Sequence, residues 1–292
     1  MRKTITLLLS AVFFMIQAAK AQEDAKADTS EKAHWEAALN YLSNSVYLGR
    51  QDSTRIPYLT PSLDYYTKSG FYFGGSMSYL GYKGVSRIDF VSLQAGYTFI
   101  VSNFEGDITA TRDFYNKQSE NVKAEAKGAL NTTFSYDFKF IKPIVQAAVT
   151  FSTKNDYYAA FGLEHSFFTD EDNLEIAPSF MVNASTQNTY SAYYSKRKYA
   201  AKNKTQRGPG TLITAILLNA SKFKIMDYEF SMPVNFSTGK FLFNFTPTAA
   251  IPVNANVVIT TTTPPSGISV TRTRTEKLSG LFFWSAGFNY TF

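Results

Sequence analysis

From residue 41 onward, the dominant pattern in this chain is an alternation of apolar and polar residues with a period of two. In 91–99 the odd positions are apolar, and Ser92, Gln94 and Thr98 lie between them. The same pattern runs through 126–139 and 241–253. Because successive side chains of a β-strand point to opposite faces, this period predicts strands with one apolar and one polar face.

About twelve such segments follow one another, with ends defined to about 2–4 residues. They lie at 42–50, 56–67, 70–82, 88–101, 104–115, 124–140, 141–152, 156–168, 173–195, 211–236, 240–253 and 277–292. The connections after even-numbered segments are tight, whereas the two longest, 196–210 and 254–276, follow odd-numbered segments. A different division of 173–195 or 211–236 would give ten or fourteen segments.

An even number of antiparallel strands, with short turns at one end and long loops at the other, is typical of a membrane-spanning β-barrel. A bilayer holds no water to satisfy an unpaired backbone amide, so strands cross it only when they close into a ring. No stretch after residue 21 approaches the ~18 continuous apolar residues of a membrane helix. We therefore predict an all-β fold, a closed antiparallel transmembrane β-barrel of about 12 strands, at residues 41–292.

The N-terminal 40 residues divide into two parts. Residues 1–21 contain a basic start, a short apolar run and an A-x-A pattern, which together predict a signal peptide. Residues 22–40 are polar and predict a short periplasmic extension, with Trp35, Ala38, Leu39 and Leu42 at helical spacing. Either this extension is a short helix or loose tail, or Trp35 inserts into the barrel mouth as a plug.

The last strand carries apolar residues on every second position up to the C-terminus, namely Phe282, Trp284, Ala286, Phe288, Tyr290 and Phe292. With this strand and the architecture of 41–292, the chain resembles the outer-membrane β-barrel proteins of Gram-negative bacteria. The resemblance implies a location in the cell outer membrane and contact with its lipid and lipopolysaccharide. It also implies that the barrel-assembly machinery reads Phe288, Tyr290 and Phe292 as an assembly signal. Nucleic acid is a poor partner for a protein at this location, and the oligomeric state stays open.

If the apolar faces meet lipid, the polar faces line the interior. This parity predicts an acid-rich lumen. Its candidate charges are Asp64, Glu105, Asp107, Asp137, Lys139, Glu164, Asp227 and Glu229, joined by Asp113, Glu125, Lys127, Glu175 and Lys142. Two interpretations remain: a structural network of paired charges, or a cation-preferring conduit. Eight-stranded barrels are filled by side chains and 16-stranded barrels hold open channels, so about twelve strands indicate a narrow or gated pathway.

The connection at 196–210 is strongly basic. Its candidate polyanion contacts are Lys196, Arg197, Lys198, Lys202, Lys204 and Arg207, and no acidic residue lies between Ile176 and Met226. Clustered cations attract polyanions such as lipopolysaccharide, although a solvated loop without a partner is the alternative. The Thr/Pro-rich stretch 260–265 predicts a flexible exposed segment.

The chain offers little for catalysis or metal binding. It has no cysteine and two histidines, His34 in the predicted extension and His165 with the lipid-side parity of Phe161 and Phe167. No serine can be tied to either histidine by spacing, and we predict no enzyme, no cofactor and no metal site. The favoured function is a narrow or gated transport channel for small solutes or ions. The alternative is a non-conducting surface-binding or structural barrel, and an outer-membrane hydrolase is the least favoured.

Overall fold

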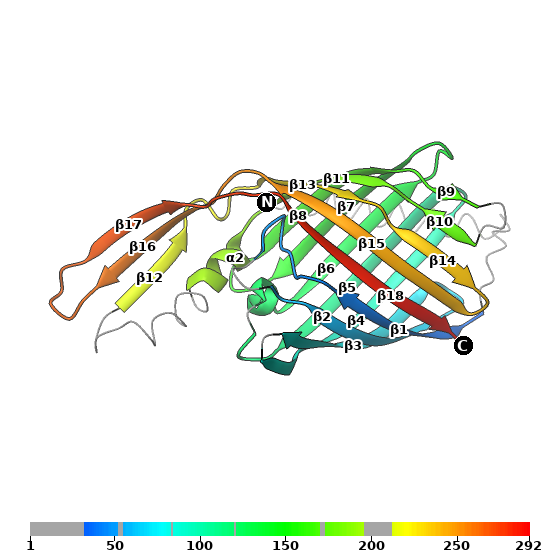
Figure 1. The fold of residues 1–292 in the computed structure, drawn as a ribbon, viewed down its shortest axis with the longest axis horizontal. Helices are drawn as coiled ribbons and strands as arrows, with labels where there is room; N and C mark the ends of the chain where they lie inside the picture. Colours follow the sequence, from blue (N-terminus) through cyan, green and yellow to red (C-terminus); the bar gives the residue numbers. More distant parts are fainter. Residues whose placement is uncertain (1–31, 52–54, 83, 120, 170–172, 196–211) are drawn as a thin grey trace, which may run out of the picture. The chain divides into compact units, whose positions relative to one another are not determined.

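The structure, a computed structural model, describes residues 32–51, 55–82, 84–119, 121–169, 173–195 and 212–292. Residues Ala33–Phe292 form one compact unit, in which most strands surround a common axis (Figure 1). The strands of this main sheet are β1 (His34–Leu42), β2 (Tyr58–Tyr66), β3 (Phe71–Tyr82), β4 (Val85–Val101), β5 (Phe104–Tyr115), β6 (Gly128–Tyr136), β7 (Lys142–Phe151), β8 (Asp156–Glu164), β9 (Phe167–Phe168), β10 (Leu174–Ile176), β11 (Ser179–Ser185), β13 (Lys224–Ser231), β14 (Val234–Thr238), β15 (Phe241–Pro252) and β18 (Leu281–Thr291).

The main sheet closes on itself. Strand β1 pairs with both β2 and β18, and β13 pairs with both β11 and β15, always antiparallel. Short breaks divide three of the barrel strands into two segments each, namely β8 and β9, β10 and β11, and β13 and β14. Two of these breaks contain Pro178 and Pro233, which have no backbone N–H to give to the sheet. The predicted all-β fold, a closed antiparallel barrel of twelve strands, is confirmed.

The two faces of the barrel differ as the alternation predicts. On β3, Phe71, Phe73 and Met77 are 60%, 53% and 48% exposed on the outside. Between them, Tyr72 is buried and bonded across the lumen side to Asp107. The exterior is therefore an apolar surface suited to lipid, and the interior is polar.

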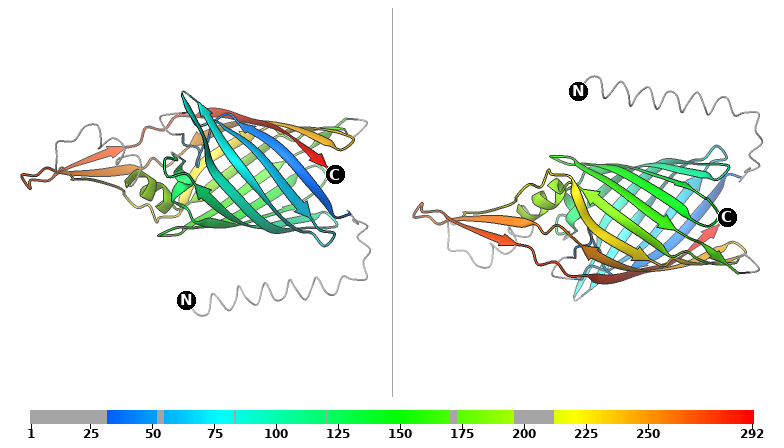
Figure 2. Two further views of the ribbon diagram at one scale, coloured as in Figure 1. Left: turned by 90° about the horizontal axis from the view of Figure 1, so that it is seen from below. Right: turned by 90° about the horizontal axis from the view of Figure 1, so that it is seen from above.

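The two ends of the barrel also differ. The tight turns after β2, β4, β6, β9 and β14 lie at one end, here called the turn end, together with both ends of the described barrel chain (Figure 2). At the turn end, Trp35 and Phe292 exchange two backbone hydrogen bonds of 3.1 and 2.9 Å, which tie the last residue to the first strand. The longer connections lie at the opposite end, here called the loop end.

The first strand differs from the prediction. It spans His34–Leu42, within the predicted extension, and not 42–50. Trp35 is exposed on the outer face and its ring lies 4.9 Å from that of Tyr65, so the plug interpretation of Trp35 is wrong. Residues 35–42 satisfy both a helical and an alternating pattern, and pairing with β2 and β18 selects the strand.

Parts of the predicted barrel strands 173–195 and 211–236, and of the connection 254–276, form separate elements. A second, three-stranded sheet joins β12 (Leu212–Leu217), β16 (Val257–Thr263) and β17 (Val270–Thr275), in the order β12-β16-β17. The short helix α2 (Asn188–Tyr193) and the 3-10 turn η1 (Val122–Glu125) lie in connections at the loop end. In the described part of the chain, no helix is both long enough and apolar enough to cross a membrane.

Candidate functional site: the lumen and its loop-end mouth

A belt of carboxylates lines the half of the lumen nearest the turn end. The acidic belt consists of Glu36, Asp64, Glu105, Asp107, Glu164 and Glu175, from strands β1, β2, β5, β8 and β10. Each lies on the polar face of its strand, opposite the apolar exterior. In the β1–β2 ladder, Glu36 and Asp64 are directly paired, so two carboxylates stand side by side.

Neutral side chains hold most of these carboxylates in place. Their donors are Asn289 Nδ2 to Glu36 Oε1 at 2.8 Å, Gln94 Nε2 to Asp64 Oδ1 at 2.7 Å, Tyr72 OH to Asp107 Oδ2 at 2.9 Å, Ser166 Oγ to Glu175 Oε1 at 2.7 Å and Asn235 Nδ2 to Glu175 Oε2 at 3.0 Å. Amide and hydroxyl donors orient a carboxylate without cancelling its charge.

Among the described residues, Glu105 is the one member of the acidic belt that forms a salt bridge. Lys142 Nζ lies 2.7 Å from Glu105 Oε2, and Lys142 is paired with Glu164 in the β7–β8 ladder. The Lys142 ammonium therefore forms a salt bridge with Glu105 and lies beside Glu164 in the ladder. The acidic belt as a whole keeps a negative charge. A low-dielectric wall lined by charge of one sign concentrates counter-ions, so this geometry favours cations in the lumen.

Two of the predicted lumen charges lie at the rim. Asp137 and Lys139 are exposed in the turn between β6 and β7, where Lys139 N donates to Asp137 Oδ1. They border a cavity of about 230 Å³ at the turn end, which Glu105, Lys142 and Glu164 also line. Asp227 and Glu229 lie instead on β13, and Asp227 is completely buried.

At the loop end, a tight turn folds against the barrel wall beside Asp227. This mouth turn, Tyr47–Arg50, is closed by backbone bonds of 2.8 and 3.0 Å between its first and last residues. Leu48 and Gly49 have φ angles of 51° and 69°. A Cβ on Gly49 would lie 2.6 Å from Asp227 Cβ, so only glycine allows this close approach.

Arg50 fastens the mouth turn. Its side chain is almost fully buried, and its guanidinium donates to Leu48 O at 2.7 Å, Met226 O at 3.2 Å, Val253 O at 2.9 Å, Asn254 O at 3.2 Å and Glu276 Oε2 at 3.1 Å. One side chain thus joins the first connection to the ends of β13 and β15 and to the segment before β18. Sequence reasoning missed Arg50, because 42–50 was assigned to a strand; the Gly-Arg pair within that segment was the available signal.

Helix α2 packs beside the mouth turn. Tyr190 of α2 forms a buried apolar cluster with Ala215, Leu217 and Val258, and Tyr47 packs against it. Burial raises the pKa of the Tyr47 and Tyr190 hydroxyls, which therefore stay neutral. Asp156 positions the helix by accepting the backbone N–H groups of residues 188 and 189 at 2.6 and 2.7 Å.

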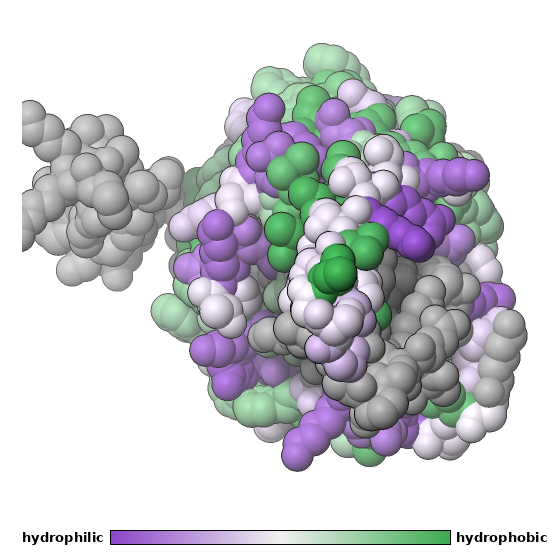
Figure 3. All heavy atoms as spheres, turned by 90° about the vertical axis from the view of Figure 1, so that its left-hand side faces the viewer, coloured by the Kyte–Doolittle hydropathy of each residue, from purple (hydrophilic) through white to green (hydrophobic). Residues whose placement is uncertain are grey.

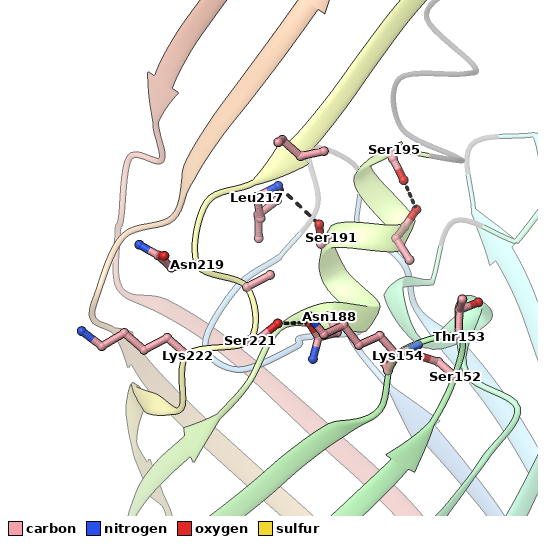
Figure 4. Close-up of a pocket in the computed structure, with 13 residues that line it drawn as sticks. Ser152, Thr153, Lys154, Asn188, Ser191, Ser195, Leu217, Asn219, Ser221 and Lys222 are labelled. Carbon is pink, nitrogen blue, oxygen red and sulfur yellow. Dashed lines mark hydrogen bonds between the residues drawn. The ribbon is translucent and has the colours of Figure 1, made fainter.

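A groove of about 770 Å³ also opens at the loop end (Figure 4). It is lined by Ser152, Thr153, Lys154, Asn188, Ser191, Ala192, Ser195, Ile216, Leu217, Asn219, Ala220, Ser221 and Lys222. Ser221 Oγ donates to Asn188 Oδ1 at 2.8 Å, Ser195 Oγ donates to Ala192 O at 3.0 Å, and Ser191 Oγ accepts Leu217 N–H at 3.3 Å. Because these hydroxyls are already used within the protein, the groove is a weaker candidate than the lumen.

The remaining sequence predictions concern the basic connection, the two histidines and metal binding. The basic residues Lys196, Arg197, Lys198, Lys202, Lys204 and Arg207 lie outside the described residues. His34 lies in β1, stacked on Tyr66, and His165 makes an edge contact with Phe167. In the segments that the structure covers, no cluster of His, Asp or Glu could hold a metal ion.

No protein-family profile matches this chain, and no curated protein matches it. Among solved structures it is similar to the KdgM porin, with 8% identity and a TM-score of 0.42 over 89% of this chain and 99% of that chain. It is also similar to Salmonella typhi OmpF in complex with daunomycin, with 9% identity and a TM-score of 0.32 over 89% and 97%. The outer membrane channel DcaP of Acinetobacter baumannii gives 10% identity and a TM-score of 0.32 over 89% and 96%. At these values the likeness carries no argument about this chain.

Proposed function

We propose that this outer-membrane β-barrel protein is a narrow, gated conduit that prefers small cations. The closed ring and apolar exterior place the barrel in the outer membrane, and short turns in such barrels face the periplasm. The observation that carries the proposal is the acidic belt, in which neutral donors hold most of the carboxylates and one lysine forms a salt bridge with Glu105. Its negative potential admits cations and disfavours anions.

The gate in this proposal is the mouth turn. At the loop end it lies against Asp227 of β13, where it is fixed by Arg50 and Glu276 and packs through Tyr47 on α2. A pathway through the lumen would open when this turn moves away from Asp227. Hydrogen bonds to a charged group contribute about 1.5–3 kcal/mol, so loss of the Arg50 bonds should shift the closed-to-open ratio by roughly tenfold or more.

Planar-bilayer recording tests both parts of the proposal. In a potassium chloride gradient, we expect the wild-type protein to open rarely, with a reversal potential displaced toward the potassium equilibrium potential. Arg50→Ala should open more often without changing the sign of that displacement. Arg87→Ala is the matched control, because Arg87 also pairs with a carboxylate at the loop end, that of Asp89, but does not contact the mouth turn.

The outcomes separate the alternatives. A displacement toward the chloride equilibrium potential would refute the cation preference. Equal opening of Arg50→Ala and Arg87→Ala would refute the gate. Both variants must still show the gel shift between unheated and heated samples that a closed barrel gives in detergent.

A non-conducting structural or surface-binding barrel is the second candidate. The observation that favours it is the buried cluster of Tyr190, Ala215, Leu217 and Val258, which fills space beside the mouth turn with apolar side chains. This candidate predicts no conductance from the wild type or from Arg50→Ala.

A further inference from the structure

The three-stranded sheet carries a cationic face that the proposed conduit does not use. In the β16–β17 ladder, Arg272 is directly opposite Thr260 and Arg274 is opposite Val258. Directly opposed residues share a face, so both arginines lie on the face of Thr260 and Thr262. A hollow of about 710 Å³ beside these arginines is lined by Thr260, Thr262, Val270, Arg272 and Arg274, and also by Thr273, which the ladder register puts on the opposite face.

The charges on this face are not neutralised within the described part of the chain. Every residue of β17 is exposed, and neither arginine takes part in a described salt bridge. The segments 254–275 and 212–223 contain no acidic residue, and the nearby Glu276 is already paired with Arg50. The two guanidinium groups are two residues apart, which is about 6.7 Å along a strand. They can therefore bind anionic groups of the same partner.

The position of the sheet indicates what kind of partner reaches this face. The sheet projects beyond the loop end of the barrel (Figures 1 and 2), and Figure 3 views it from that side, with hydrophilic residues around the rim. The projection takes the arginines away from the lipid that surrounds the barrel wall. The threonine hydroxyls beside them can hydrogen-bond to sugar hydroxyls, and Val270 can pack on a sugar ring.

We infer that the Arg272/Arg274 face of the β16–β17 hairpin binds an acidic, carboxylate-bearing polysaccharide outside the membrane. The guanidinium groups would bind the carboxylates, and Thr260 and Thr262 would bind neighbouring hydroxyls. The inference is independent of conduction, because neither arginine belongs to the acidic belt or to the mouth turn. The face does end at Val258, in the buried cluster against which Tyr47 of the mouth turn packs.

Because threonine and arginine alternate in β17, the two arginines can be moved without changing the amino-acid composition of the protein. The face-exchange variant, Thr271→Arg/Arg272→Thr/Arg274→Thr/Thr275→Arg, moves both arginines to the opposite face of the same strand, at positions that do not line the hollow, and keeps the net charge. The full-length protein in detergent would be titrated with alginate, a polyuronate, and with dextran as a neutral polymer. We expect the wild type to bind alginate more weakly as salt rises, and the face-exchange variant to bind roughly tenfold more weakly, since charge-assisted hydrogen bonds are lost.

A second variant, Arg272→Thr/Arg274→Thr, removes both positive charges and so distinguishes the effect of arginine position from that of net charge. If this variant binds weakly but the face-exchange variant binds like the wild type, net charge alone acts and the inferred site is wrong. Equal binding by all three proteins would also refute it, since residues 196–211 are the same in each. Binding to vesicles that contain lipopolysaccharide but not to alginate would assign the face to a lipid headgroup and overturn the inferred partner.

Discussion

At the scale of single residues, the proposed selectivity depends on carboxylates that neutral donors hold in the lumen. Asp64→Asn and Asp107→Asn each remove one negative charge and keep the shape of the side chain. A charge about 8 Å from an ion contributes roughly 0.5 kcal/mol in water, about a twofold change in local cation concentration. We expect each substitution to lower the potassium-to-chloride permeability ratio by roughly that factor, as measured from reversal potentials.

Asp137→Asn is the matched control for these two substitutions. Asp137 is exposed in the β6–β7 turn, where the full dielectric of water screens its charge. Its substitution should change the permeability ratio less than either lumen substitution. If all three substitutions have the same small effect, the acidic belt does not set selectivity.

At the scale of elements, the mouth turn depends on a close approach that a methyl group would prevent. In Gly49→Ala, the added Cβ would lie 2.6 Å from Asp227 Cβ, so the mouth turn would have to move. Gly84→Ala is the matched control, because Gly84 has a φ of 81° but no atom within 4 Å of the added Cβ. Both substitutions carry the left-handed penalty of about 1–2 kcal/mol. We expect only Gly49→Ala to raise the open probability in bilayer recordings; equal effects would mean that backbone strain, and not displacement, is responsible.

The elements also show what the sequence could predict. The face of each barrel strand follows from local alternation, which is why the exterior positions of Phe71, Phe73 and Met77 were predictable. The location of β1 was not predictable, because residues 35–42 fit two periods and only the distant β18 decides between them. The threonine-rich stretch 260–265 was predicted as flexible, yet residues up to Thr263 form β16 through pairing with β12 and β17. The mouth turn was not predicted because it too depends on distant residues: Arg50 forms hydrogen bonds with residues about 200 positions away.

At the scale of the whole molecule, the C-terminal strand has one structural role and one predicted role. Strand β18 closes the ring between β1 and β15, with Phe288 facing Phe243 and Tyr290 facing Phe241 on the outside. The same aromatic residues, with Phe292, are the predicted assembly signal. Closure needs the backbone of the strand, whereas recognition by an assembly machinery needs the side chains at its end. Substitution of a terminal side chain should therefore affect assembly in cells more than folding in detergent.

Phe292→Ser and Phe241→Ser form a matched pair for this distinction. Both residues are outward-facing aromatics at the turn end, 51% and 43% exposed, so both substitutions remove similar apolar contact with lipid. Refolding into detergent, followed by the gel shift between unheated and heated samples, should give equal yields of closed barrel. In cells, we expect the outer-membrane yield of Phe292→Ser to fall severalfold below that of Phe241→Ser. Equal yields in cells would assign Phe292 a purely structural role, because the terminal position would then carry no information beyond its contact with the lipid.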